Sequence, residues 1–201
     1  MLGVLMADKH FSFRRILNSM RASKTSSKTN QFFTIRSATN EDCAEICDIY
    51  NFYIESSVIT FDEKPMEPSS WQDKLQQLQD LNLPFIVATS ESGQLLGFAY
   101  LAPWRQKSAY RRTVENTIYL KPNAIGQGLG PRLLSELLRL GKDAGIKEVV
   151  AVISDSEADT SIQMHKKFGF KKVGQLPGVG NKFNRWLGVI LMQKSLQEPL
   201  N

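Results

Sequence analysis

Residue types that build metal sites and disulfide frameworks are scarce in this sequence. Its 201 residues include two cysteines and two histidines. A structural zinc site needs about four such ligands at short spacings, so we predict no metal centre. Cys43 and Cys47 lie close together on a predicted helix and are interpreted as small buried side chains. So few thiols are typical of a protein from a reducing compartment.

Long apolar runs are absent, and most of the chain carries no excess of charge. No run approaches the ~18–20 apolar residues that span a bilayer, so we predict no membrane partner. Residues 1–33 hold six basic residues and one acidic residue, while the other 168 residues carry 19 of each sign. The net charge of +5 therefore comes from the first 33 residues. We predict no nucleic-acid partner, because a neutral body lacks the basic surface that phosphates attract.

Residues 1–33 are predicted to lie outside the folded domain, which we place at residues 34–196. Residues 11–22 can form a basic amphipathic helix, which is typical of an organelle transit peptide. A disordered extension explains the same composition equally well. We therefore expect a cytoplasmic protein, with a mitochondrial location as the alternative if residues 1–33 act as a transit peptide.

Hydrophobic periodicity predicts the element order β-α-α-β-β-β-α-β-α-β-β for residues 34–196. One strand–helix–strand crossover lies among hairpins. This favours an α/β (α+β) fold with a mixed, mostly antiparallel central sheet flanked by helices. Ser70 is predicted to cap the second helix, because Asp73 follows three residues later. The last two strands are expected near Phe170–Gln175 and Arg185–Gln193.

A glycine-rich loop between a strand and a helix is the most informative local pattern. The β-type run Thr113–Leu120 is followed by Gly126, Gly128 and Gly130, and a leucine-rich helix begins at about Leu129. Glycines permit close approach to the backbone, and the first-turn amides of a helix have no internal partner. The helix dipole adds a partial positive charge at the same point. The pattern therefore predicts a diphosphate-binding loop.

Six motifs follow one another along the chain: Ile35-Arg-Ser-Ala-Thr, Pro103-Trp-Arg-Gln-Lys-Ser-Ala-Tyr, Thr113-Val-Glu-Asn-Thr-Ile-Tyr-Leu, Gly128-Leu-Gly, Met164-His-Lys-Lys-Phe-Gly-Phe and Val179-Gly-Asn-Lys-Phe. Together they resemble the GCN5-related N-acetyltransferase (GNAT) superfamily, and more narrowly the phosphinothricin/methionine sulfone N-acetyltransferases. The resemblance covers roughly residues 34–195. It implies a GNAT fold, acetyl-CoA as co-substrate and a homodimer. The implied acceptor is the amine of a small amino-acid-like substrate, of the phosphinothricin or methionine sulfone/sulfoximine type.

The resemblance implies two catalytic residues. Glu115 is the candidate general base, taking a proton from the amine directly or through water; spacing alone favours a solvent-facing carboxylate. His165 stands where many superfamily members keep a tyrosine that protonates the departing thiolate, and a histidine titrates near neutrality. The alternative for His165 is a packed, hydrogen-bonded structural residue. Direct transfer is expected, because neither Cys43 nor Cys47 lies near the motifs.

The resemblance also implies the residues that bind the two substrates. Those expected to bind the acyl donor are Ile118, Tyr119, Leu120, Gly126, Gln127, Gly128, Leu129, Gly130, Pro131 and Asp159. Those expected to contact the acceptor are Phe61, Arg105, Lys107, Tyr110, Thr113, Val114 and Glu115. Within the second set, Arg105 and Lys107 are interpreted as a clamp for the acceptor's carboxylate.

The sequence departs from the superfamily pattern at three donor-binding positions. Ile125 stands where a Gln or Arg is usual, so backbone amides and Gln127 must bind more of the diphosphate. Pro131 lacks an N–H, although proline suits a first helical turn. Relatives carry an Asn near the start of the fourth helix, and here Asp159 is expected to take its place.

Three other functions fit parts of the sequence. A protein or peptide N-acetyltransferase shares the same fold but has little use for a carboxylate clamp. A non-catalytic acyl-CoA-binding module is suggested by the departures from the family pattern. A nucleic-acid-binding function rests only on residues 1–33.

Overall fold

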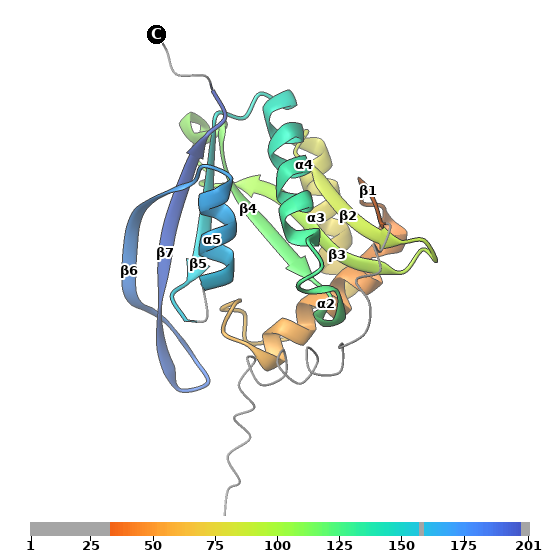
Figure 1. Cartoon of the computed structure of the whole chain (residues 1–201), viewed down its shortest axis with the longest axis horizontal. Helices are drawn as coiled ribbons and strands as arrows, with labels where there is room; N and C mark the ends of the chain where they lie inside the picture. The colour runs from red at the N-terminus through yellow and green to blue at the C-terminus, as the bar shows by residue number, and fades with distance from the viewer. Residues whose placement is uncertain (1–32, 157–158, 198–201) are drawn as a thin grey trace, which may run out of the picture.

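The computed structural model describes residues 33–156 and 159–197 (Figure 1). The helices and strands, in chain order, are β1 (Phe33–Ser37), α2 (Cys43–Ser56), α3 (Pro68–Asp80), β2 (Phe85–Ser90), β3 (Leu95–Pro103), β4 (Thr113–Leu120), α4 (Leu129–Asp143), β5 (Glu148–Ser154), α5 (Asp159–Lys167), β6 (Lys171–Lys182) and β7 (Arg185–Ser195). The predicted element order is confirmed. The predictions for the N-terminal extension lie outside the described residues, apart from Phe33, which opens β1.

The strands form one seven-stranded sheet in the order β1-β2-β3-β4-β5-β7-β6. Every neighbouring pair is antiparallel except β4 and β5, which confirms the mixed, mostly antiparallel sheet. The parallel pair is short, because only Thr113–Glu115 are in register with Glu148–Val150. Beyond this point β4 and β5 diverge, as Figure 1 shows. The sheet is therefore open between its two central strands.

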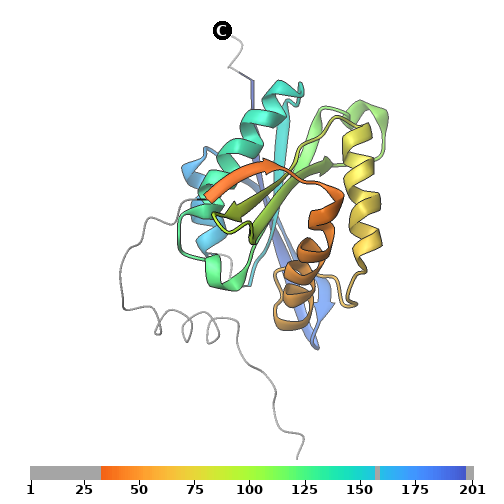
Figure 2. The same ribbon diagram turned by 90° about the vertical axis from the view of Figure 1, so that its right-hand side faces the viewer.

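Each face of the sheet is covered by its own pair of helices (Figure 2). On one side, α4 buries a stripe of four leucines: Leu133, Leu134, Leu137 and Leu138. Burying one such side chain is worth about 1.5–3 kcal/mol, so this stripe determines which face of α4 meets the sheet. On the other side, Trp71 of α3 packs against Phe98 and Tyr100 of β3. Both faces are needed for the functional site, because the opening in the sheet connects them.

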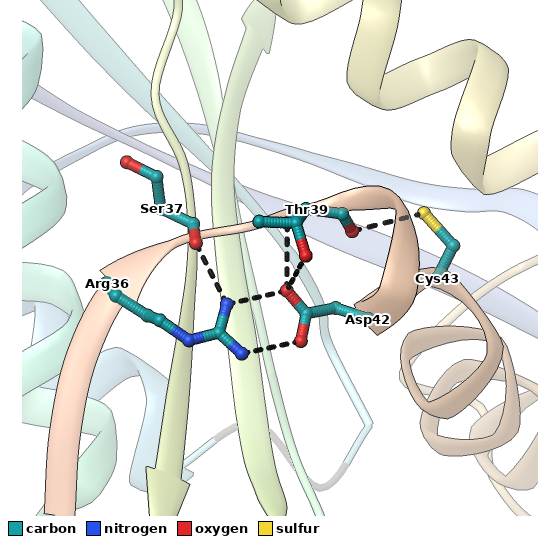
Figure 3. A network of polar contacts seen from close by, with 5 residues as sticks. All are labelled: Arg36, Ser37, Thr39, Asp42 and Cys43. Atoms are coloured by element: carbon teal, nitrogen blue, oxygen red, sulfur yellow. Dashed lines mark hydrogen bonds and ion pairs between the residues drawn. The ribbon is translucent and has the colours of Figure 1, made fainter. Parts of the chain in front are cut away.

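An ion pair between the exposed Arg36 and the buried Asp42 holds β1 against the start of α2 (Figure 3). Two nitrogens of Arg36 each lie 2.7 Å from a carboxylate oxygen of Asp42, and the Thr39 amide donates to Asp42 at 2.8 Å. Burial acts to raise the pKa of Asp42, but these hydrogen bonds outweigh it and the pKa is lowered. The pairing fixes the entry into α2, whose later turns bring Tyr50 and Tyr53 to the functional site.

Two predicted boundaries are wrong. The second helix begins at Pro68 after Glu67, so Ser70 lies in its first turn and does not cap it. Proline is favoured at a first helical position because it has no N–H to leave unpaired. The strand expected near Phe170–Gln175 runs on to Lys182 in a long hairpin with β7. The helix expected from about Leu129 is α4, which ends at Asp143 with Gly145 just beyond it at φ +79°.

No helix in the described part of the chain is both long and apolar enough to cross a membrane.

Candidate active site

A cavity of about 1280 Å³ lies where β4 and β5 diverge, and we call it the β4–β5 cleft. It is lined by Tyr50 and Tyr53 from one face of the sheet and by Met164 and His165 from the other. The cleft therefore passes through the opening in the sheet. Its volume exceeds the about 300–1,000 Å³ typical of a small-molecule pocket.

One end of the cleft is formed by the glycine loop and the start of α4. Gly126 and Gly128 have φ values of +82° and +79°, a region that favours glycine. A side chain built at either position meets no atom within 4 Å, so the space above the loop is open. Gly128 is the N-cap of α4 and no side chain caps it. The first-turn amides are therefore available to an anion, as the loop pattern predicts.

Most of the residues expected to bind the acyl donor line this cleft. They are Ile118, Tyr119, Leu120, Gly126, Gly128, Leu129, Gly130, Pro131 and Asp159. Gln127 does not line it, because its side-chain amide donates to the Asn123 carbonyl at 2.8 Å within its own loop. The backbone of the loop, rather than the Gln127 side chain, is placed to meet a diphosphate.

The backbone of β4 beyond Glu115 has hydrogen-bond partners in β3 but none in β5. Residues 116–120 thus have no partner strand on the β5 side, where an extended amide-containing ligand can pair with free backbone groups as an added strand does. Tyr53 already donates to the Leu120 carbonyl at 2.6 Å, so this end of the strand is fixed from α2. Tyr53 is a site residue that the sequence analysis missed.

Glu115 lines the cleft at the point where the strands begin to diverge. Burial raises the pKa of its carboxyl, while the positive charges of Arg105 and Lys74 lower it. A general base works best when its pKa lies near the operating pH, so burial shifts Glu115 in the useful direction. Burial is the largest of these effects, so the pKa of Glu115 is raised overall.

Lys74 is a second residue that the sequence analysis missed. It lies one turn after Trp71 in α3, and its Nζ is 5.1 Å from the ring centroid of Tyr100 and 5.8 Å from that of Trp71. Tyr100 and Glu115 both line the cleft. The spacing of Trp71 and Lys74 places them on one helix face, but only the packing of α3 on the sheet brings that face to Glu115.

His165 is buried, with 4% of its surface exposed, and lines the side of the cleft opposite α2. Its Nδ1 lies 2.8 Å from the Ser161 carbonyl oxygen, and its Nε2 lies 3.0 Å from Nδ2 of Asn116. A carbonyl only accepts, so Nδ1 carries the proton and Nε2 accepts from Asn116. Burial lowers the pKa of the ring, and the Ser161 hydrogen bond raises it. The neutral ring has no proton at Nε2, and its role as an acid stays a prediction.

The residues expected to contact the acceptor are divided between the cleft and its surroundings. Phe61 and Glu115 line the cleft. The guanidinium carbon of Arg105 lies 4.2 Å from the ring centroid of Trp104. Its positive charge lowers the pKa of Glu115. Lys107 and Tyr110 are exposed outside the lining, and Thr113 is half-buried in β4. Val114 is 1% exposed and packs in the core on the α4 side, so its side chain faces away from the acceptor.

A polar network holds the segment that carries Phe61. Tyr50 donates to Asp62 at 2.6 Å and pairs with Thr60 at 2.8 Å. The buried Lys182 of β6 donates to the Thr60 carbonyl at 2.9 Å. Burial lowers the pKa of Lys182, opposed by Asp62 and Glu63. The network joins α2, the segment around Thr60 and the β6–β7 hairpin into one wall of the cleft.

No group of three or more His, Cys, Asp and Glu side chains able to hold a metal ion occurs among residues 33–156 and 159–197.

The cleft therefore combines an opening between two central strands, an uncapped helix start suited to an anion and the partly buried carboxylate of Glu115. Comparison with known proteins gives the family. Residues 40–170 match the family model described as the acetyltransferase (GNAT) family. The chain belongs to this family, which confirms the resemblance found in the sequence.

Relatives of known name cover most of the chain. Phosphinothricin N-acetyltransferase from Streptomyces viridochromogenes is 39% identical over 82% of this chain and 88% of its own. L-methionine sulfoximine/L-methionine sulfone acetyltransferase from Salmonella typhimurium is 35% identical over 82% of this chain and 95% of its own. A phosphinothricin acetyltransferase from Sinorhizobium meliloti, solved in complex with acetyl-CoA, has a TM-score of 0.78 and 34% identity, covering 81% of this chain and 88% of that one.

The pKa of Glu115 should set the pH at which the reaction rate falls on the acid side of the pH–rate profile. The carboxylate is the active form of a base, so acceptor kcat/KM should fall as the pH drops through a raised pKa, above the ordinary value of 4.5. The change Lys74→Met removes a charge that lowers this pKa, so the fall should move to higher pH. Lys142→Met, in the last turn of α4, should leave the profile unchanged. An unchanged profile in the Lys74 variant would show that its charge does not act on Glu115.

Proposed function

We propose that this protein transfers an acetyl group from acetyl-CoA directly to the amine of a small amino-acid-like substrate. The observation that carries the proposal is the position of Glu115 in the same cleft as the open glycine loop. One substrate can be held at the loop while the other reaches the carboxylate. The names of the relatives support both an acetyl donor and an amino-acid-like acceptor.

Each part of the cleft has a task in this reaction. Acetyl-CoA, when bound, supplies an acetyl group activated as a thioester. The amides around Gly126 and Gly128 bind its diphosphate, and the unpaired backbone of residues 116–120 orients its arm. Glu115 takes a proton from the acceptor's ammonium group, which frees the nitrogen lone pair for attack. The charges of Arg105 and Lys74 attract the acceptor's carboxylate to the same end of the cleft.

Direct transfer is favoured over an acyl-enzyme because no thiol reaches the cleft. Cys43 and Cys47 are buried in α2, where their Sγ atoms lie 3.7 Å from the Thr39 carbonyl and 3.0 Å from the Met66 carbonyl. Burial raises the pKa of both thiols, which keeps them in the less nucleophilic protonated form.

A thiol-release assay with a panel of acceptors tests the proposal. With acetyl-CoA as donor, we expect phosphinothricin, methionine sulfone and methionine sulfoximine to give kcat/KM values at least about 10-fold above those of a methionyl peptide. A peptide lacks the free α-carboxylate beside its amine, and one unmatched charged contact is worth about this factor. Methionine amide is the matched control for the carboxylate, since it keeps the side chain.

Two outcomes would contradict the proposal and point to different functions. Faster acetylation of the peptide would indicate a protein N-acetyltransferase. Tight binding of acetyl-CoA with no thiol release for any acceptor would indicate an acyl-CoA-binding module.

We also propose that the protein is a homodimer formed through the outer edge of the sheet. The edge strand β6 and its hairpin expose several large apolar side chains: Val173, Leu176, Val179, Phe183 and Trp186. Trp186 is 75% exposed, and an apolar patch on a sheet edge is a surface that proteins usually cover. A second copy of the chain covers such an edge on both partners at once.

Sedimentation measurements test the dimer. The 22.7 kDa chain should sediment at about twice this mass, and Trp186→Glu should weaken the dimer by about 10-fold or more, since buried tryptophans dominate interface energies. Leu81→Glu is the control, because Leu81 is also an exposed apolar residue. It follows α3, which packs on β3, and three strands separate β3 from β6 in the sheet. A wild-type monomer, or equal association of the Trp186 variant, would contradict the proposal.

The cellular location, expected to be cytoplasmic with a mitochondrial alternative, stays a prediction that depends on residues 1–33.

A further inference from the structure

The side-chain amide of Asn116 has an unusual set of partners for a buried group. Asn116 is 7% exposed and lines the β4–β5 cleft. Its Nδ2 donates to Nε2 of His165 at 3.0 Å. Its Oδ1 is buried and has no hydrogen-bond partner among the described residues. Leaving a buried acceptor unpaired is unfavourable, so such an atom in a cleft points to a ligand that donates.

The orientation of this amide follows from the contacts of His165. The Ser161 carbonyl at 2.8 Å requires a proton on Nδ1, which leaves Nε2 of the neutral ring as an acceptor. Only the NH₂ group of Asn116 can donate to it, so Oδ1 is the atom of this amide that is left without a partner. The other neighbour of the ring is Phe170, edge-on at 4.9 Å. Asn116 is the hydrogen-bond partner of Nε2, so it is the group that must respond when Nε2 gains a proton.

Asn116 and Glu115 are neighbours on β4 and project to opposite faces of the sheet. Glu115 lies on the side of α3, where Lys74 acts on it, and Asn116 lies on the side of α5 and α4. The glycine loop at the start of α4 is on the Asn116 side as well, since Gly130 faces Met164 of α5. The ligand that Oδ1 meets is therefore the one held by the glycine loop.

We propose that Asn116 is a positioning residue that binds the acyl donor and fixes the tautomer of His165 through one amide group. Its Oδ1 accepts a hydrogen bond from an amide N–H of the donor's arm, while its Nδ2 keeps the Nε2 atom of His165 unprotonated. This inference rests on the proposed function, because the ligand is the acetyl-CoA of that reaction.

The two contacts of Asn116 cannot both be kept when Nε2 of His165 is protonated. A proton on Nε2 makes the ring a donor, so the amide must turn over and offer Oδ1 to it. Oδ1 is then lost to the ligand. Binding of the donor and protonation of His165 consequently oppose each other, and by linkage each weakens the other equally. A proton leaves His165 through Nε2 only after Asn116 has turned.

Nitrogen NMR of the histidine ring tests the inference in the full-length protein. His10→Gln leaves His165 as the single histidine. Without ligand we expect Nδ1 protonated and Nε2 bare, and acetyl-CoA should move the titration midpoint to lower pH. Asn116→Asp supplies a carboxylate that accepts from Nε2–H, so the midpoint should rise by about 1–3 pH units. Asn116→Leu should weaken acetyl-CoA binding by about 2- to 10-fold, the loss of one hydrogen bond.

The possible results separate this inference from the proposed function. Amide shifts of Gly126 and Gly128 report acetyl-CoA binding independently of Asn116. If they do not move, the proposed function fails. If they move while the His165 midpoint and the affinity of the Leu variant stay unchanged, the inference fails and the function stands. A protonated Nε2 in the ligand-free wild type overturns the inference directly, whether or not the Leu variant folds.

Discussion

The early end of the pairing between β4 and β5 is the constraint on which the rest of the site depends. Register is kept only from Thr113 to Glu115, and the strands then diverge. The divergence exposes backbone groups of β4, joins the two faces of the sheet and places Glu115 at its apex. An unpaired strand edge inside a protein is unfavourable unless a ligand completes it. Under the proposed function, the arm of the acyl donor takes the place of the missing strand beside β4.

The two faces of the sheet divide the chemistry between them. On the α4 and α5 face, open amides at Gly126 and Gly128 favour an anion, and Asn116 faces His165. On the α2 and α3 face, Glu115 lies in the field of two cations. Since adjacent residues of a strand point to opposite faces, Glu115 and Asn116 face different sides of the cleft from consecutive positions. Under the proposed function, the donor and the acceptor approach from these two sides.

The sequence predicted the features that depend on local patterns. The element order, the start of the leucine-rich helix α4 near Leu129 and the open loop around Gly128 all follow from periodicity or backbone preference. Glu115 was found through its motif context, because strand alternation alone favours a solvent-facing carboxylate. The cap at Ser70 was predicted wrongly because Pro68 is the stronger start signal for the helix.

The features that the sequence could not predict depend on contacts between distant segments. Lys74 acts on Glu115 only because α3 packs across β3, and the Asn116–His165 pair joins positions 49 residues apart. Gln127 could donate to a ligand or to its own loop, and only the folded loop shows the bond to Asn123. The length of β6 depends on its pairing with β7 rather than on its own composition.

Comparing binding and turnover in the Glu115→Gln variant tests the central claim most directly. Glutamine keeps the size of the side chain and cannot take a proton. If the cleft holds the acyl donor at the glycine loop and uses Glu115 as base, turnover should fall by about 10²–10⁴-fold while the dissociation constant of acetyl-CoA stays within about twofold. Unchanged turnover would remove Glu115 from the mechanism. A loss of acetyl-CoA binding equal to the loss of turnover would show that the two substrates are not separated as the structure indicates.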